Sequence, residues 1–238
     1  MAMTPHGLAL KAYFEGQMTA EITVRRDDGF EASLPAKHFF RSAAEFSPLE
    51  TAALRLCRGH ILDIGAGSGI HSLALESTGL TVTAIDISPE AIEIMIRRGV
   101  KDTQHADMLN YQGGPYETIL MLGHGIGITG DLDGLDKFLI YAHNLVTSDG
   151  QILLDSLDVS RSHDENNLSY HDANRRAKRY IGETRIQMEY LGIKGPYFGW
   201  LHVDSLTLAE HAGQAGWNCE VIREEENGEY LARLVQAK

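Results

Sequence analysis

Three glycines alternate along one short stretch of the chain, at Gly65, Gly67 and Gly69, just after Asp63 and just before a helix-forming run from Ile70. Glycine lets the backbone turn sharply and approach a ligand closely, because no Cβ stands in the way. The first amides of the following helix have no partner inside it and point outward. The pattern therefore predicts a loop that binds a nucleotide-type cofactor, with an ordinary glycine-rich turn as the alternative.

The spacing of these glycines separates two kinds of cofactor. A dinucleotide loop of the NAD type has the pattern G-x-G-x-x-G and holds a pyrophosphate at the helix N-terminus. Here the pattern is D-x-G-x-G-x-G, and Ile70 occupies the place of the third NAD-type glycine. The acid at Asp63 suits a ligand with positive charge better than it suits a pyrophosphate. The stretch resembles motif I of the class I S-adenosylmethionine-dependent methyltransferases.

A second acidic residue follows the loop at a sequence separation typical of nucleoside-binding folds. The run 80–86 has the composition of a buried strand, and it ends in Asp86. Nucleoside-binding folds place a carboxylate about 20 residues beyond the loop, where its two oxygens accept hydrogen bonds from the ribose hydroxyls. We therefore expect Asp86 to bind the ribose of the donor. Alternatively, Asp86 serves only as a residue at the start of the next helix.

The resemblance implies roles for further residues near the loop. Asp107 would accept a hydrogen bond from the adenine amino group, and Met108 would lie against the ring. Considered alone, Asp107 is equally compatible with a helix cap. The residues expected to bind the donor are Asp63, Gly65, Ala66, Gly67, Gly69, Asp86, Ile87, Asp107, Met108, Leu122, Gly123 and Arg41.

Strands and helices alternate along most of the chain, which is typical of a doubly wound α/β fold. Buried strands are predicted at 116–124 and 151–157, the second entered through a turn at Asp149–Gly150, with a helix between them. Asn227–Gly228 is a two-residue hairpin signal, and such a turn joins only antiparallel strands. We expect a mostly parallel seven-stranded sheet with an antiparallel last strand, as in the Rossmann-like methyltransferase fold, whereas a simple NAD-binding sheet stays parallel.

Residues 1–53 form the first of two expected parts, an N-terminal hairpin and cap segment. In the methyltransferase family, the segment before motif I often folds over the cofactor. Phe39 and Phe40 would then lie over the methyl donor and contact the substrate, and Arg41 would reach the donor's carboxylate. Hydrophobic packing with a surface arginine is equally compatible with these residues. The remainder, 54–238, is expected to be the methyltransferase domain that binds S-adenosylmethionine.

Residues 158–203 are expected to form an insertion in that domain and to act as a substrate lid. The second part of this segment alternates, turns at Gly195–Pro196 and then carries Tyr197, Trp200 and His202. We expect these three to contact the substrate near the carboxyl ends of the strands, where open α/β folds bind ligands. Packing of the same aromatic residues onto the core is the alternative.

Methyl transfer from a sulfonium makes few covalent demands on the protein. It is an in-line displacement, so the enzyme mainly aligns the reacting atoms and excludes water. A base is needed only if the acceptor arrives protonated. His124 ends the predicted strand 116–124, and a histidine pKa of about 6.5 suits this role. We take His124 as the catalytic candidate; a hydrogen bond to the backbone of its glycine-rich turn is the alternative, and His71 and His202 are weaker candidates.

The acidic balance of the chain argues against a nucleic-acid partner. The formal net charge is −12, and we interpret the basic run 175–179, which follows an acidic one, as a solvated helix face. The residues after strand 116–124 also lack the Asp/Asn/Ser-Pro-Pro-aromatic element of enzymes that methylate exocyclic amines of nucleic-acid bases. Asp155 with Asp158 is too small a carboxylate cluster to indicate a metal site, so no metal is expected.

Two cysteines, Cys57 and Cys219, do not suggest a disulfide framework. No apolar run reaches the roughly 18 residues of a membrane span, and the N-terminal residues lack the charged-then-apolar pattern of a signal peptide. We expect a cytoplasmic protein without a membrane partner, present as a monomer or homodimer.

The sequence thus predicts transfer of a methyl group from S-adenosylmethionine to a small-molecule acceptor with an oxygen, nitrogen or carbon nucleophile. Two other functions remain as alternatives. One is a catalytically idle domain that binds the cofactor, because motif I reports binding and not turnover. The other is a nicotinamide-dependent oxidoreductase, which the glycine spacing and the reversed last strand disfavour.

Overall fold

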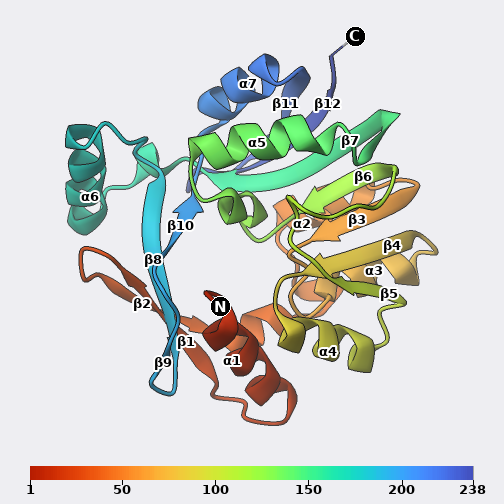
Figure 1. The fold of residues 1–238 in the computed structure, drawn as a ribbon, viewed down its shortest axis with the longest axis horizontal. Helices are drawn as coiled ribbons and strands as arrows, with labels where there is room; N and C mark the ends of the chain where they lie inside the picture. Colours follow the sequence, from red (N-terminus) through yellow and green to blue (C-terminus); the bar gives the residue numbers. More distant parts are fainter. Residues whose placement is uncertain (238) are drawn as a thin grey trace. The chain divides into compact units, whose positions relative to one another are not determined.

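The computed structural model describes residues 1–237. Seven strands form one sheet in the order β11-β12-β7-β6-β3-β4-β5, and a second sheet has the order β10-β8-β1-β2 with β9 paired to β8 (Figure 1). The chain divides into two compact units that interleave along the sequence. Unit 1 contains Met1–Ser47, Arg58–Tyr111 and Arg185–Phe198, and unit 2 contains Pro48–Cys57, Gln112–Thr184 and the chain from Gly199 on.

Unit 1 contains the strand–loop–helix element that the glycine pattern predicts. Its elements in chain order are β3 (His60–Ile64), α3 (Ile70–Ser77), β4 (Thr81–Asp86), α4 (Pro89–Arg98) and β5 (Asp102–His105). Strand β4 pairs in parallel with both β3 and β5. Parallel strands need crossover connections, and the helices supply them here. The predicted β-α-β order is confirmed, with element ends within about two residues of the predicted ones.

The remaining elements of unit 1 agree with the prediction only in part. Helix α1 (Thr4–Phe14) was not predicted, because its apolar residues show no clear 3.6-residue stripe. The expected N-terminal hairpin is present as β1 (Glu21–Arg26) and β2 (Glu31–Pro35). Strand β8 (Glu183–Tyr190), from the predicted insertion, pairs antiparallel with β1 through its residues 186–189 and with β9 (Ile193–Lys194). The N-terminal hairpin and the predicted insertion, which we expected to be separate segments, therefore share one sheet.

Helix α1 is held against α4 by packing and by charge. Lys11 Nζ donates to Glu93 Oε2 at 2.7 Å, and Leu10 and Ile94 belong to one buried cluster. His6 on the same helix meets the ring of Phe39 edge-on, with 4.7 Å between ring centroids. Phe39 lies in a short helix, η1 (Ala36–Phe40). The cap segment is thus built on α1.

Unit 2 begins with α2 (Pro48–Leu56) and continues through β6 (Tyr116–Met121), α5 (Leu132–Ala142) and β7 (Val146–Leu157). Strands β6 and β7 are parallel, and their register shifts after Tyr116. The predicted turn at Asp149–Gly150 is wrong, because β7 continues through these residues and absorbs them as an irregularity in the ladder.

The C-terminal elements of unit 2 confirm the reversed last strand. They are η4 (Val159–Arg161), α6 (Glu165–Arg176), β10 (Phe198–Leu201, which starts in unit 1), α7 (Ser205–Gln214), β11 (Trp217–Glu224) and β12 (Glu229–Gln236). Strand β12 pairs antiparallel with β11 on one side and with β7 on the other. Trp217 is buried and donates to the carbonyl of Leu139 at 2.9 Å, which ties β11 to α5.

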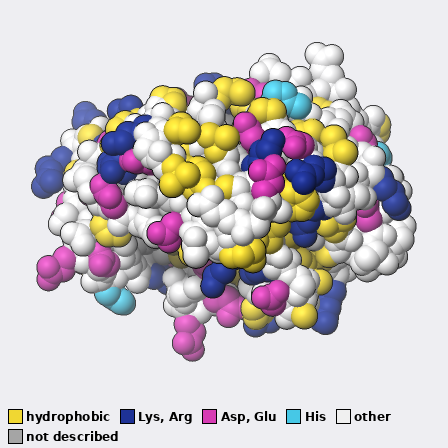
Figure 2. Space-filling view, turned by 90° about the horizontal axis from the view of Figure 1, so that it is seen from below, with side chains coloured by type: hydrophobic (Ala, Val, Ile, Leu, Met, Phe, Trp, Pro, Cys, Tyr) yellow, Lys and Arg dark blue, Asp and Glu magenta, His cyan; other side chains and the backbone are white. Residues whose placement is uncertain are grey.

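Charge and hydrophobicity show no single dominant patch on the face drawn in Figure 2. Acidic and basic side chains are interspersed there, and hydrophobic ones lie between them. Within the basic run 175–179, Arg175 pairs with Asp172 at 2.7 Å. Among residues 1–237, no helix is both long and apolar enough to cross a bilayer.

Burial of His6 predicts a measurable loss of stability in acid. Burial lowers the pKa of His6 to about 4. Below about pH 6.5 the unfolded chain therefore binds a proton that the folded chain does not, and stability falls as the pH drops toward 4. The variant His6→Leu has no imidazole at this position, so it lacks this pH-dependent contribution to stability. Its free energy of unfolding should fall about 2 kcal/mol less than that of the wild type between pH 7 and pH 5.

Urea unfolding at the two pH values measures this difference directly. An equal loss of stability in both proteins would show that His6 is not held neutral in the folded state.

Candidate functional site

The glycine loop adopts a backbone that residues with a side chain rarely use. Gly65, Gly67 and Gly69 have φ values of +70°, +59° and +80°. The amides of Gly65 and Ala66 both donate to the carbonyl of Ile85, at 2.9 and 3.1 Å, so the loop is fastened to the end of β4. The predicted loop residues 65–69 thus lie together as expected.

The glycines at 67 and 69 are needed for different reasons. A Cβ on Gly69 would lie 2.8 Å from a side-chain carbon of Val100, so this glycine permits the close packing of α3 on its neighbours. A Cβ on Gly67 would meet only the carbonyl oxygen of Gly65, at 4.0 Å. The space beside Gly67 is therefore open to a ligand, which is what a cofactor cradle requires.

Asp86 is aimed at this loop. One carboxylate oxygen accepts from the amide of Gly67 at 2.9 Å and the other from the amide of Ser88 at 2.8 Å. Burial raises the pKa of Asp86, and these two hydrogen bonds act in the opposite direction. A carboxylate has about four lone-pair sites, so two remain for the two hydroxyls of a ribose. The residues present fit a nucleoside on this side of the loop.

Asp63 anchors the loop from beneath. It is buried, and its carboxylate accepts from the hydroxyl of Ser72 in α3 at 2.6 Å. Burial raises the pKa of Asp63, against the charge of His71 and the bond from Ser72. In this structure Asp63 joins the end of β3 to the start of α3; its predicted contact with the donor stays a prediction.

The cap segment is tied to the glycine loop by Ser68 and Arg98, two residues that the sequence reasoning missed. The hydroxyl of Ser68 donates to the carbonyl of Phe39. Arg98, at the end of α4, donates to the carbonyl of Ser68 at 2.7 Å and lies over the ring of Phe40, 5.2 Å from its centroid. Ser68 lies inside the motif and was available to be named. Nothing in the spacing of the sequence points to Arg98.

The predicted cap residues have partners within unit 1. Phe40 contacts the rings of Tyr13 and Phe14, with centroid distances of 4.8 and 6.1 Å. Arg41 donates from Nε to the carbonyl of His38 at 2.8 Å. The aromatic rings of Tyr13, Phe14 and Phe40 thus form a small cluster. The expected contacts of Phe39, Phe40 and Arg41 with donor or substrate stay predictions.

The residues predicted around the adenine follow β4 and β5. Asp107 is exposed and accepts from the amide of Leu109 at 3.0 Å and from the side chain of Asn110 at 3.1 Å, as a turn cap does. Met108 is buried, whereas Ile87 is 44% exposed. An exposed carboxylate and an exposed isoleucine near the loop are compatible with adenine binding, which stays a prediction.

In unit 2, the chain after β6 makes a tight turn at the predicted catalytic position. Leu122 is buried, Gly123 has a φ of +70°, and His124 has a φ of +58°, in the left-handed region. The helical turn η3 (Gly125–Thr129) follows. The amide of His124 donates to Asp155 Oδ1 at 2.9 Å, which fastens this turn to β7. This bond holds the backbone of His124 in place after β6.

Two carboxylates lie close to His124. Asp155 pairs with Leu231 in the β7–β12 ladder, so Asp155 and Glu229 lie on the same face of these strands. His124 Nε2 lies 3.3 Å from Glu229 Oε1. Burial alone would lower the pKa of His124, but the bond with Glu229 and the charges of Asp155 and Glu229 raise it. The bond from His124 lowers the pKa of Glu229 to about 2.

His202 lies beside His124 in unit 2. The two imidazoles are edge to face, with 5.5 Å between their centroids. Burial, together with the charge of His124, lowers the pKa of His202 to about 3. The ring of Trp200 leaves no room for a Cβ on Gly127, which would lie 2.2 Å from it. Tyr197 belongs to unit 1 and is 38% exposed.

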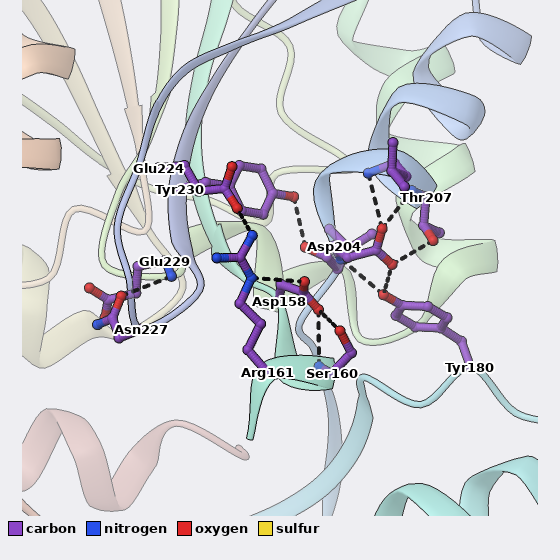
Figure 3. Close-up of polar contacts among 12 residues, drawn as sticks. Asp158, Ser160, Arg161, Tyr180, Asp204, Thr207, Glu224, Asn227, Glu229 and Tyr230 are labelled. Carbon is purple, nitrogen blue, oxygen red and sulfur yellow. Dashed lines mark hydrogen bonds and ion pairs between the residues drawn. The ribbon is translucent and has the colours of Figure 1, made fainter. Parts of the chain in front are cut away.

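The backbone that carries His202 is held by a network of tyrosines and acids (Figure 3). The hydroxyl of Tyr180 donates to Asp204 at 2.6 Å and accepts from the Asp204 amide at 2.9 Å. Asp204 also caps α7 by accepting from Thr207. The hydroxyl of Tyr230 donates to the carbonyl of Val203 at 2.7 Å. These bonds hold the backbone at Val203 and Asp204, the two residues that follow His202.

Glu229 is the residue of this cluster that the sequence reasoning missed. It follows the Asn227–Gly228 turn, and its amide donates to the side chain of Asn227 at 3.0 Å, as Figure 3 shows. The sequence predicted the hairpin but not its register against β7, and only the register brings Glu229 to His124. Among residues 1–237, no group of three or more His, Cys, Asp or Glu side chains is arranged to hold a metal ion.

Comparison with known proteins agrees with this arrangement. Residues 37–220 match a family model described as a methyltransferase domain. A crystal structure of an S-adenosylmethionine-dependent methyltransferase from Bacteroides fragilis, in complex with S-adenosyl-L-homocysteine, is 36% identical, covers 98% of this chain and 95% of its own, and has a TM-score of 0.87. No curated protein matches the sequence.

Two more distant structures show the fold alone. The CcbJ methyltransferase from Streptomyces caelestis is 13% identical, with 80% of this chain and 88% of that chain covered and a TM-score of 0.60. The structure of DhpI in complex with SAH is 18% identical, with coverage of 98% and 99% and a TM-score of 0.57. Given the family match over most of the chain and the similarity to the Bacteroides protein, the chain belongs to the S-adenosylmethionine-dependent methyltransferases, and S-adenosylmethionine is its methyl donor.

Proposed function

We propose that this methyltransferase acts on a small-molecule acceptor, through an oxygen, nitrogen or carbon nucleophile. The observation that carries the donor half of the proposal is the open space beside Gly67, bordered by the carboxylate of Asp86. The mixed surface charge of Figure 2 and the net charge of −12 support a small acceptor over a polyanion. The expectations of a cytoplasmic location and of a monomer or homodimer stay predictions.

The residues of unit 1 have the task of holding the donor. The loop from Gly65 to Gly69 presents its backbone, Asp86 accepts from the ribose, and Asp107 and Met108 border the adenine. The donor supplies a methyl group made electrophilic by its sulfonium. Because the chemistry is a displacement, correct alignment and exclusion of water account for most of the rate that the protein contributes.

The residues of unit 2 have the task of handling a proton. His124 is turned toward Glu229, and the carboxylate orients the imidazole as the acid of a catalytic dyad does. In the neutral ring, Nε2 then carries the hydrogen that Glu229 accepts, and Nδ1 carries the lone pair. His124 is thus suited to accept a proton from an acceptor that arrives protonated.

Gly67→Val should abolish binding of the donor. Valine strongly disfavours a φ of +59°, and its side chain would enter the open space beside the loop. We expect affinity for S-adenosylhomocysteine, measured by calorimetry, to fall by at least about 100-fold, which corresponds to about 2.8 kcal/mol.

Gly79→Val is the matched control for this variant. Gly79 also has a positive φ, +90°, and a Cβ at this position would have nothing within 4 Å, but the residue lies at the end of α3 and away from the loop. The control should lose stability and keep its affinity. Normal binding by a folded Gly67→Val protein would refute this placement of the donor.

Asp86→Asn should weaken donor binding without abolishing it. The amide nitrogen of asparagine cannot accept a hydrogen bond, and the remaining bonds lose their charge assistance. We expect affinity for S-adenosylhomocysteine to fall roughly 10- to 100-fold. Asp102→Asn is the control, because Asp102 accepts from Thr83 on the neighbouring strand and does not contact the loop. Equal affinities of the two variants would remove Asp86 from the donor site.

Incubation with a metabolite extract and isotopically labelled S-adenosylmethionine tests turnover itself. The methyltransferase should transfer label to a low-molecular-weight product, and Gly67→Val should not. A protein that binds S-adenosylhomocysteine tightly yet labels no product in any extract would be the idle binding domain instead.

A further inference from the structure

Two imidazole nitrogens in unit 2 lack a hydrogen-bond partner. His202 Nδ1 is buried and makes no hydrogen bond in the described structure. His124 uses Nε2 for Glu229, and no hydrogen bond of residues 1–237 reaches its Nδ1. Buried polar atoms are nearly always paired. The buried, unpartnered Nδ1 of His202, on a ring beside that of His124, therefore points to a ligand that pairs with it.

A neutral imidazole has one donor and one acceptor nitrogen, and its hydrogen-bond partners decide which nitrogen carries the lone pair. Glu229 accepts from Nε2 of His124, which leaves the lone pair on Nδ1 whenever that ring is neutral. His202 stays neutral, because its pKa of about 3 lies far below any physiological pH. His202 then has one lone pair, and a ligand that donates to its unpartnered Nδ1 selects the tautomer with the lone pair on that nitrogen. The centroids of the two rings lie 5.5 Å apart.

The charges around the pair favour a cation. The groups that act on His124 are Asp155 of β7, Glu229 of β12 and the neutral His202 after β10. Glu50 of α2 adds a further negative charge that acts on Glu229. The charges of Asp155 and Glu229 favour the protonated form of His124, so they favour a positive group at this place and disfavour an anion.

We propose that His124 and His202 together bind an amino group, so that the acceptor of this enzyme is a small amine methylated on nitrogen. This inference rests on the proposed function and narrows it. With the lone pair of His202 on Nδ1, a hydroxyl, which has one hydrogen, pairs with only one of the two acceptors, and a carbon nucleophile pairs with neither. An ammonium group has three N–H bonds, enough for both imidazoles, and its charge matches the surrounding carboxylates.

Methyl transfer to an ammonium group requires loss of one proton before the nitrogen can attack. His124 Nδ1 takes one proton from the ammonium and frees the lone pair on nitrogen, while His202 Nδ1 holds a second N–H in place. That lone pair forms the new N–C bond as the C–S bond breaks and its electrons return to sulfur. The products are the methylated ammonium and S-adenosylhomocysteine, and the proton on His124 passes to solvent.

The chemistry of the product tests the proposal. The enzyme is incubated with methyl-¹³C-labelled S-adenosylmethionine and either an untreated metabolite extract or the same extract with its amines blocked by an amine-selective acetylating reagent. Carbon NMR distinguishes methyl groups on nitrogen, oxygen and carbon. We expect an N-methyl signal that is absent with the blocked extract.

The outcomes separate this inference from the proposed function. An O-methyl or C-methyl product, or a product that survives blocking, overturns the amine and leaves the methyltransferase on small molecules intact. No labelled product with either extract contradicts the proposed function and this inference with it.

Imidazole NMR of the protein with S-adenosylhomocysteine provides a readout other than activity. We expect His124 to carry its hydrogen on Nε2 when neutral, and His202 to stay neutral from pH 8 to pH 5. A protonated His202 at neutral pH, or a hydrogen on Nδ1 of neutral His124, would overturn the assignment of two acceptors.

Variants separate acceptor binding from structure. His202→Leu removes the acceptor atom and should raise the KM for the amine at least about tenfold, whereas His202→Gln keeps an acceptor oxygen and should restore most of the loss. Glu229 is a positioning residue, and Glu229→Gln should lower the pKa of His124. Glu224→Gln is the control: Glu224 lies on the same hairpin as Glu229 but pairs with Arg161, so this variant should leave the pKa of His124 unchanged. Equal KM values for the two His202 variants would contradict binding through Nδ1.

Discussion

The carboxylate of Asp86 joins the glycine loop, where we propose that the donor binds, to the next helix. One of its oxygens accepts a hydrogen bond from the amide of Gly67 and the other from the amide of Ser88, and both bonds are close to 2.9 Å. These two bonds add to those from the amides of Gly65 and Ala66 to Ile85, and together they hold three glycines of positive φ in one conformation, although glycine has the most backbone freedom to lose. The same carboxylate that shapes the loop is left with lone pairs for a ribose.

The histidine pair depends in turn on two bonds to the β7–β12 ladder. Asp155 holds the backbone of His124 in the left-handed region, and Glu229 holds its ring. Histidine tolerates this backbone better than most residues, but it still needs support from its surroundings. The reversed last strand thus does more than complete the sheet. By pairing with β7 it brings a carboxylate to a turn that lies more than a hundred residues earlier in the chain.

What the sequence could predict follows the range of the interactions involved. The glycine loop, the acid at the end of β4 and the Asn227–Gly228 hairpin are local patterns, and each is present in the structure. Arg98 and Glu229 reach their partners only through packing and strand register, for which a single sequence has no local signal. The turn expected at Asp149–Gly150 failed for a related reason: two turn-forming residues were accommodated as a bulge because the strand on either side continued to pair.

The same distinction explains why family membership identifies the donor but not the acceptor. The residues proposed for the donor lie mostly in one continuous stretch from Asp63 to Met108, within a unit whose fold is shared with other methyltransferases. The histidine pair is assembled from a turn after β6, a strand end after β10 and the start of β12. If the histidine pair binds the acceptor, as we propose, a change in any one of these three places alters acceptor chemistry and leaves the glycine loop intact. Acceptor specificity therefore has to be argued from the side chains of this chain, and two unpaired nitrogens are the sharpest constraint that they offer.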